Sequence, residues 1–269
     1  MKKIILPDEP QIPILPNLFT AGNLLCGFFA ILVIFKGINS PDWVAAKDCY
    51  RTATYLIFAS CVFDLLDGRV ARMSGQDGPF GREFDSLADI VSFGIAPALL
   101  VAKAVLFELT PPELGWGIGI LYLLCAAMRL ARFNCMASQP KKEGQSSDFV
   151  GLPVPMAAGA VVSTMYLMIY LTDKSVDLGP LKYIVAVAMA GVSILMMSRV
   201  VYPSFKHVNF RTKGTAVAIV LTALFIVSMV MYPWVMPTVV FCIYIFYGLV
   251  RRWIDSKWRK CIEHDDQDC

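Results

Sequence analysis

Charged residues are scarce in this chain, and the residue patterns of soluble metal-binding or disulfide-linked domains are missing. Asp, Glu, Lys and Arg make up 17% of the 269 residues, against 57% hydrophobic residues and a mean hydropathy of +0.61. There are two histidines, and the eight cysteines include no C-x-x-C pair, which argues against a zinc site or a disulfide framework. A net charge of +3 is too small for a nucleic-acid-binding surface. These absences indicate an integral membrane protein.

The sequence contains several long apolar runs. A helix needs about 20 apolar residues to cross a bilayer, where it must satisfy its own backbone hydrogen bonds. Stretches of this kind cover residues 17–35, 50–72, 84–106, 114–134, 153–171, 181–199, 214–231 and 234–250. The sequence therefore predicts an all-α fold, a polytopic transmembrane helix bundle of about eight spans. The last two spans are separated by a very tight turn, so a re-entrant pair is the alternative there.

The distribution of basic residues predicts the orientation of this bundle. With eight spans both termini lie on one face, and 18 of the 24 Lys and Arg residues fall on that face. The opposite face holds Lys36, Lys47, Arg51, Lys103, Lys174 and Lys182. Because cytoplasmic loops carry the excess of positive charge, we expect both termini in the cytoplasm. Prolines interrupt the first residues, so no signal peptide is predicted.

A single membrane domain accounts for almost the whole chain. We expect a cytoplasmic N-terminal segment over residues 1–16, the membrane domain over 17–250, and a cytoplasmic tail over 251–269 that is first basic and then acidic. The basic run at 251–260 is interpreted as an anchor to anionic lipid headgroups. Membrane lipids are therefore expected partners, and nucleic acid is not.

Four aspartates lie at helical spacing where the second predicted span ends and the third begins. Asp64 and Asp67 are three residues apart and Asp85 and Asp89 are four apart, so each pair shares a helix face. A connection rich in glycine and proline, residues 73–80, is typical of a turn that returns the chain antiparallel. Four carboxylates at one membrane depth would repel one another without a cation. Hard oxygen ligands favour one or two Mg²⁺ or Mn²⁺ ions, which would bind a substrate phosphate.

Two neighbours of the carboxylates indicate room for that substrate. Gly68 is predicted in mid-helix, where glycine costs about 0.5 to 1 kcal/mol relative to alanine. Its missing side chain is interpreted as space for a ligand such as a nucleotide. Arg72 lies two turns beyond Asp64 and would reach a phosphate, or else extends to the cytoplasmic edge of the membrane.

The spacing of these residues resembles the signature of the class I CDP-alcohol phosphotransferase family. The pattern D-x2-D-G-x2-A-R-x8-G-x3-D-x3-D runs from Asp64 to Asp89 without a departure. Outside this core, four segments resemble the bacterial and archaeal phosphatidylserine synthase branch of that family. They are LPNLFTAGNL at 15–24, RLARFN at 129–134, FVGLPVP at 149–155 and SRVVYPSFK at 198–206.

The resemblance implies a reaction, a cofactor and a set of site residues. CDP-diacylglycerol would donate its phosphatidyl group to the hydroxyl of L-serine, releasing CMP. The enzyme would be a homodimer of the bacterial or archaeal cell membrane, with two divalent ions. The distribution of basic residues predicts that its active site lies at the cytoplasmic face. The principal metal ligands would be Asp64, Asp67 and Asp85. Asp89 would face the second ion and accept the serine hydroxyl proton, two roles that sequence does not separate. Residues bordering the CDP-diacylglycerol would include Gly68, Ala71, Arg72 and Gly81.

Further polar residues are candidates for binding the two substrates. The serine carboxylate would be gripped by basic residues at the cytoplasmic ends of the fourth and sixth predicted spans. These are Arg129, Arg132, Arg199 and Lys206, for which the alternative is a topological or lipid-binding role. Asn17 and Thr20 would contact the nucleotide, or cap the first helix.

Two other functions stay open at this point. The acidic signature is related to binding of the CDP-containing donor and does not specify the alcohol. Glycerol 3-phosphate, inositol phosphate and choline are therefore alternative acceptors. A cation transporter would also use intramembrane carboxylates, but these cluster at one membrane edge and no acidic partner lies on the predicted spans four to seven.

Overall fold

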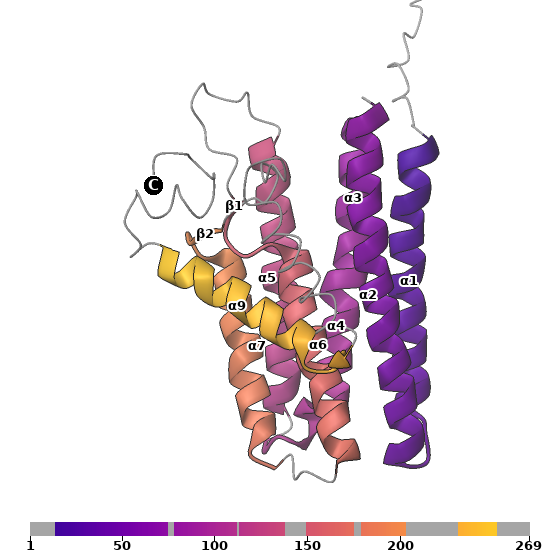
Figure 1. Ribbon diagram of the computed structural model, residues 1–269, viewed down its shortest axis with the longest axis vertical. Coiled ribbons are helices and arrows are strands. Elements are labelled where there is room, and N and C mark those ends of the chain that lie inside the picture. The colour runs from indigo at the N-terminus through magenta and orange to yellow at the C-terminus, as the bar shows by residue number, and fades with distance from the viewer. Residues whose placement is uncertain are drawn as a thin grey trace, which may run out of the picture.

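The computed structural model of the protein is a helix bundle (Figure 1). It describes residues 14–74, 78–111, 113–137, 149–174, 179–202 and 231–251. The predicted all-α class is confirmed, apart from one pair of two-residue strands. Among the described residues, four helical stretches are long and apolar enough to cross a membrane. They are Leu15–Ile38, Pro79–Ala104, Glu113–Met136 and Val154–Asp173, which correspond to the predicted spans one, three, four and five.

The elements follow one another in the order that the apolar pattern predicts. The helices are α1 (Ile14–Ile38), α2 (Trp43–Ser74), α3 (Pro79–Asp89), a π-helical segment η1 (Ile90–Ile95), α4 (Ala96–Ala104), a 3₁₀ turn η2 (Leu106–Glu108), α5 (Glu113–Ala137), α6 (Val154–Asp173), α7 (Leu181–Met197) and α9 (Met236–Val250). The strands are β1 (Phe149–Val150) and β2 (Val201–Tyr202), which pair antiparallel.

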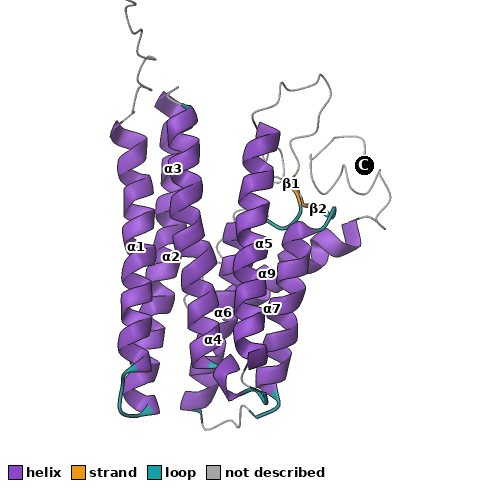
Figure 2. Cartoon of the chain, turned by 180° about the vertical axis from the view of Figure 1, so that it is seen from behind, coloured by secondary structure: helices purple, strands orange, loops and turns teal. Residues whose placement is uncertain are grey.

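The long helix α2 is not among the four apolar stretches, although it has 32 residues. Charged residues at both of its ends lower its hydropathy, and two of them are the aspartates of the predicted site. It packs against α1, and its residue range includes the predicted second span, residues 50–72. Figure 2 shows the short turn that joins the two helices at one end of the bundle. The start of α1 and the junction of α2 with α3 lie at the other end.

The C-terminal part of the bundle has shorter helices than predicted for full spans. α7 has 17 residues and α9 has 15. In Figure 1, α9 crosses the bundle obliquely instead of running parallel to the other helices. The predicted span at 214–231 lies outside the described residues except for Met231. The count of eight spans and the location of the termini therefore stay predictions.

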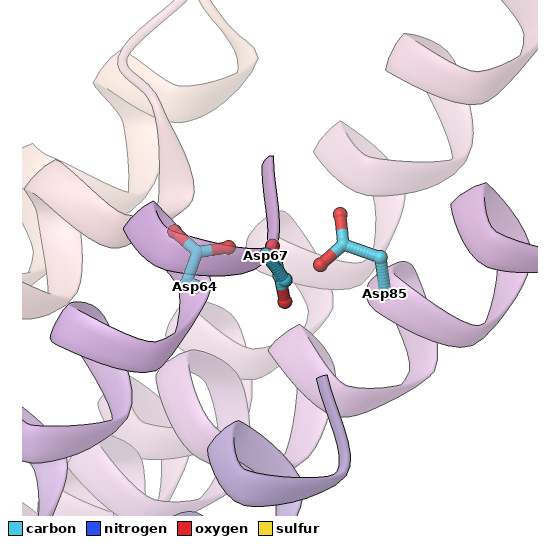
Figure 3. Close-up of side chains that lie close together, drawn as sticks. All are labelled: Asp64, Asp67 and Asp85. Atoms are coloured by element: carbon cyan, nitrogen blue, oxygen red, sulfur yellow. The ribbon is translucent and has the colours of Figure 1, made fainter. Parts of the chain in front are cut away.

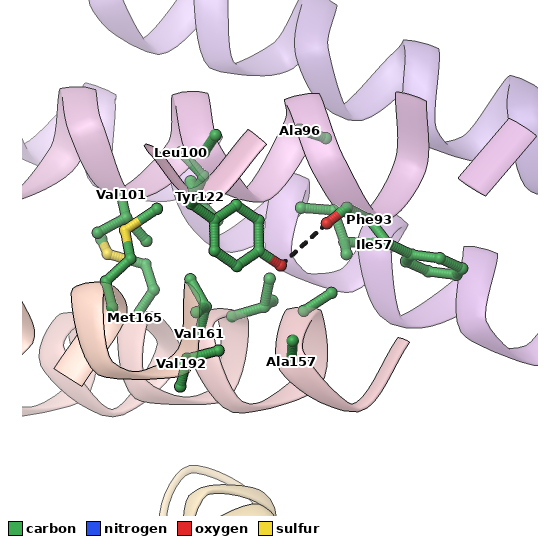
Figure 4. Packing of buried hydrophobic residues seen from close by; sticks show 14 of the residues in the cluster. Ile57, Phe93, Ala96, Leu100, Val101, Tyr122, Ala157, Val161, Met165 and Val192 are labelled. Carbon is green, nitrogen blue, oxygen red and sulfur yellow. Dashed lines mark hydrogen bonds between the residues drawn. The ribbon is translucent and has the colours of Figure 1, made fainter. Parts of the chain in front are cut away.

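The third predicted span is interrupted in the middle by the π-helical segment η1. Carbonyls in a π-helix accept bonds from the residue five positions on. Pro97, four residues after Phe93, has no N–H to donate to the Phe93 carbonyl in the usual α-helical way. The hydroxyl of Tyr122 on α5 donates a 2.9 Å hydrogen bond to the carbonyl oxygen of Phe93 (Figure 4). Both side chains are fully buried in the apolar core. The π-segment is therefore held in place by a neighbouring helix.

The strand pair lies where α6 begins and α7 ends, and the end of α9 contacts it. Pro153 is the N-cap of α6, and a second proline, Pro155, lies in its first turn. The N–H of Gly151, whose φ is +83°, donates a 2.8 Å hydrogen bond to the carbonyl oxygen of Val200. Arg251 at the end of α9 is buried and donates to the carbonyl oxygen of Val201 over 3.2 Å. The predicted lipid-anchor role is thus wrong for Arg251, and residues 252–260 lie outside the described part of the chain.

Candidate metal and substrate site

Three aspartates from two helices converge at the end of the bundle where α2 stops and α3 begins. One carboxylate oxygen from each of Asp64, Asp67 and Asp85 lies within 4.8 Å of the others. Figure 3 shows Asp67 between Asp64 and Asp85. Asp67 is 5% exposed, and the other two are partly buried. Residues separated by about 20 positions in sequence thus form one compact acidic cluster.

Local sequence explains why the two acidic helices meet. Gly78 is the N-cap of α3 in an extended conformation, and Pro79 is the first residue of the helix. Proline suits a first helical turn because its missing N–H has no partner there in any helix. α3 therefore starts only a few residues after α2 ends, and Asp85 comes to the same depth as Asp67. α2 extends to Ser74 and α3 begins at Pro79, so the connection is shorter than the predicted 73–80 and α3 begins earlier than residue 84. Residues 75–77 lie outside the described residues.

The cluster fits a divalent cation. Asp67 Oδ2 and Asp85 Oδ1 are buried and have no hydrogen-bond partner. Among the described residues, none of the three carboxylates is in an ion pair. Buried carboxylate oxygens without partners are costly, and a hard cation such as Mg²⁺ or Mn²⁺ satisfies them. The donor set contains oxygen alone, which argues against a soft metal.

Asp89 lies outside this cluster. It is 5% exposed, and Nδ2 of Asn23 on α1 donates a 3.1 Å hydrogen bond to its Oδ1. The structure thus groups three of the four aspartates, with Asp89 beside them and close enough for its charge to interact with all three. Sequence reasoning missed Asn23. The available signal was an amide within an otherwise apolar and glycine-containing run, since such a group needs a partner inside a membrane.

Helix α1 brings two further predicted residues to the acidic helices. Because α1 begins at Ile14, Asn17 and Thr20 lie within it and the capping alternative is wrong. The Thr20 hydroxyl donates to the carbonyl oxygen of Pro16 over 3.3 Å and lies beside Asp67. Both polar atoms of the Asn17 amide are buried without a partner. Asn17 Oδ1 faces Gly81, where an added Cβ would be 3.6 Å away.

The surroundings of Gly68 agree with the predicted space for a ligand. A Cβ added there would have a single neighbour within 4 Å, Nη1 of Arg72 at 3.8 Å. Arg72 itself is exposed, and Ala71 is partly buried on the same turn of α2. The open volume beside Gly68 is thus bordered by one guanidinium group.

The four basic candidates for the acceptor have different surroundings. Arg129 on α5 is 7% exposed, and its guanidinium carbon lies 5.5 Å from the centre of the Phe133 ring. It is close enough to Asp89 for the two charges to interact. Arg132 is partly buried and Arg199 is exposed, while Lys206 lies outside the described residues. Arg129 is therefore the described candidate that is both buried and near the acidic site.

Asn134 in the same segment of α5 contacts the acidic helix α3. Its Nδ2 donates to Ser86 Oγ over 2.9 Å and to Glu83 Oε2 over 3.3 Å. These bonds connect the predicted R-L-A-R-F-N segment to the helix that carries Asp85. The segment thus has a structural contact with the site besides its arginines.

Comparison with known proteins finds similar sequences over most of the chain. The family model described as CDP-alcohol phosphatidyltransferase matches residues 13–197. The chain is similar to a CDP-diacylglycerol–serine O-phosphatidyltransferase of Helicobacter pylori strain J99, with 32% identity over 93% of this chain and 94% of that protein. An enzyme of the same name from Bacillus subtilis is 31% identical over 71% of this chain and 91% of its own length. An archaetidylserine synthase of Methanothermobacter thermautotrophicus is 34% identical over 70% of this chain and 69% of that protein.

Proposed function

Since this chain belongs to the CDP-alcohol phosphatidyltransferase family, we propose that it transfers the phosphatidyl group of CDP-diacylglycerol to L-serine. The observation that carries the proposal is the cluster of Asp64, Asp67 and Asp85, with its unpartnered buried oxygens. In the reaction, the serine hydroxyl oxygen forms a bond to the phosphorus of the phosphatidyl group. The bond from that phosphorus to CMP breaks, and CMP leaves with the electron pair.

Metal dependence is part of the proposal. Asp64, Asp67 and Asp85 would hold divalent ions, Mg²⁺ or Mn²⁺, through the oxygens that have no other partner. When bound, such ions neutralise negative charge on the pyrophosphate and on the leaving CMP. Gly68, Ala71, Arg72 and Gly81 would border the donor, and Asn17 and Thr20 would contact its nucleotide from α1. The open space beside Gly68 supports this placement.

Asp89 is the proposed general base, which accepts the proton from the serine hydroxyl. A base must lie within hydrogen-bond reach of the proton that it takes. The position of Asp89 one turn deeper than Asp85, outside the three-carboxylate cluster, supports this role over that of a principal metal ligand. Its hydrogen bond to Asn23 occupies Oδ1 and leaves the second oxygen for the acceptor.

Arg129 is the proposed partner of the serine carboxylate. A buried guanidinium binds a carboxylate through two parallel hydrogen bonds, which orients the ligand as well as attracting it. Burial of Arg129 and its nearness to Asp89 support this choice over Arg132 and Arg199. A serine held there would have its hydroxyl on the side of Asp89.

The enzyme is proposed to act in the cell membrane with both termini and the site in the cytoplasm. The excess of Lys and Arg on the terminal side of the predicted spans supports this orientation. CDP-diacylglycerol would enter from the bilayer, and serine from water. Eight spans and a homodimer complete the proposal, the latter by family resemblance alone.

Release of CMP from CDP-diacylglycerol by the purified protein, with one alcohol at a time, tests the function. We expect CMP with L-serine and none above background with glycerol 3-phosphate, inositol phosphate or choline. Activity confined to a phosphorylated alcohol would refute the choice of serine while keeping the family chemistry. Metal-dependent ion flux in proteoliposomes without any CMP would instead favour a transporter.

A further inference from the structure

Asn23 contacts the acidic helix at two points at once. Its side-chain Nδ2 donates to Asp89 Oδ1 over 3.1 Å, and its backbone carbonyl accepts a 2.9 Å hydrogen bond from Ser92 Oγ. Asp89 is the last residue of α3 and Ser92 lies in the π-segment η1. All three residues are buried. One residue of α1 therefore holds both sides of the junction between α3 and η1.

Other contacts also pack this junction against its neighbouring helices, α1 and α5. Gly27, one turn further along α1, has no side chain, which lets the backbone of α1 approach Ser92 closely. On the opposite side, Tyr122 binds the carbonyl oxygen of Phe93. Single π-turns inside helices occur frequently at functional sites. Here the π-turn begins directly after Asp89, so its position affects the direction of that carboxylate.

The hydrogen bonding of Asn23 is incomplete. Its Oδ1 is buried without a partner, although the residue is 0% exposed. A buried amide with a partner for its NH₂ group but none for its oxygen contributes little to folding stability, because the oxygen has lost its hydrogen bonds to water. A leucine or alanine would fill an apolar helix face without that cost. The arrangement instead suits a residue whose useful interaction is the one with Asp89.

We infer that Asn23 is a positioning residue for catalysis, which orients the Asp89 carboxylate so that its second oxygen faces the acceptor hydroxyl. The inference rests on the proposed function, in which Asp89 takes the hydroxyl proton. The amide donates to one oxygen of Asp89 and fixes the plane of the carboxylate. Partners of this kind, which hold a reacting group without touching substrate, typically contribute about 10- to 100-fold to activity.

Kinetics of Asn23→Ala and Asn23→Ser test the inference. The two replacements are nearly equal in size and differ by one hydroxyl donor, so a packing defect affects both alike. We expect kcat of Asn23→Ala to fall by about 10- to 100-fold. KM for CDP-diacylglycerol, half-saturating Mg²⁺ and Tm in detergent should change little. Asn23→Ser should recover part of the lost kcat.

A double-mutant cycle with Asp89→Asn provides the decisive comparison. If Asn23 acts through Asp89, Asn23→Ala lowers the residual rate of Asp89→Asn no further, since coupled residues are not additive. Thr54→Val is the matched control, because Thr54 is a buried polar residue that bonds to its own helix at Tyr50. Its kcat should stay at the wild-type level.

Three outcomes would overturn the inference. They are full activity of Asn23→Ala, an equal fractional loss in the wild-type and Asp89→Asn backgrounds, and a loss of Tm that accounts for the lost rate. A wild-type protein that releases no CMP with any alcohol would refute the proposed function, and the inference with it. An active wild type with an equally active Asn23→Ala refutes the inference alone.

Discussion

Gly27 of α1 lies directly against the backbone of Ser92 in η1. A Cβ added at Gly27 would be 2.7 Å from Cα of Ser92, closer than real side chains approach a backbone atom. This contact sets the spacing between the first helix and the helix that carries Asp85 and Asp89. Neither a rotamer change nor a shift of one side chain relieves it, because a backbone atom is involved.

We therefore expect Gly27→Ala to push α1 away from η1. Overpacking of this kind typically costs about 1 to 3 kcal/mol of folding free energy. Activity should fall as well, since Asn23 and Asn17 are carried by the same helix. Thermal unfolding in detergent, followed together with CMP release, measures both effects. Gly117→Ala on α5 is the control, because a Cβ there meets nothing within 4 Å. An unchanged Tm and rate for Gly27→Ala would contradict the close contact.

Removing a carboxylate from the acidic cluster should abolish turnover without preventing membrane insertion. We expect Asp67→Asn or Asp64→Ala to reduce CMP release by at least about 100-fold, since a metal ligand and a charge are lost together. Asp48→Asn is the control, as Asp48 is an exposed aspartate near the other end of α2, paired with Arg51. Wild-type activity in either cluster variant would disprove the metal assignment.

Removal of divalent cations should stop the reaction reversibly. A chelator is expected to eliminate CMP release, and added Mg²⁺ or Mn²⁺ to restore it, because the buried oxygens of Asp67 and Asp85 lack other partners. Binding of Mn²⁺ to the protein without substrate, measured by electron paramagnetic resonance, gives a second readout. It should be lost in Asp67→Asn and retained in Asp48→Asn. A rate that is insensitive to chelation would rule out the metal-dependent mechanism.

Arg129→Gln should weaken serine binding selectively. Losing a hydrogen bond to a charged group costs about 1.5 to 3 kcal/mol, which corresponds to about a 10- to 140-fold higher KM for serine. KM for CDP-diacylglycerol should stay within about twofold. Arg199→Gln serves for comparison, since Arg199 is exposed after the end of α7. Equal effects of Arg129→Gln on both substrates would point to a structural role.

Helix positions and the acidic cluster were readable from the sequence because both depend on local spacing. Apolar runs of spanning length reveal a helix whatever it packs against, so the predicted spans one to six fall on described helices. Helical periodicity likewise placed Asp64 and Asp67 on one face of α2. The glycine and proline at the start of α3 predicted the return that brings Asp85 close to them.

Side-chain partners across helices depended on the fold. The break of the third span into α3, η1 and α4 follows from contacts with Tyr122 and Asn23, residues about 30 and 67 positions away from the segment they hold. Pro97 at the start of α4 is a local signal of the irregularity, but it does not identify the residues that hold the segment. For the same reason, the burial of Arg251 could not be predicted from a basic run in the sequence.

The sequence by itself thus determined the class of protein, the helix pattern and the carboxylates at the proposed site, because composition and periodicity act within one helix. Only the tertiary structure decided the hydrogen-bond partner of Asp89. Asn23 on α1 donates to it, since the orientation of a buried carboxylate is set by whichever polar group the neighbouring helix presents to it.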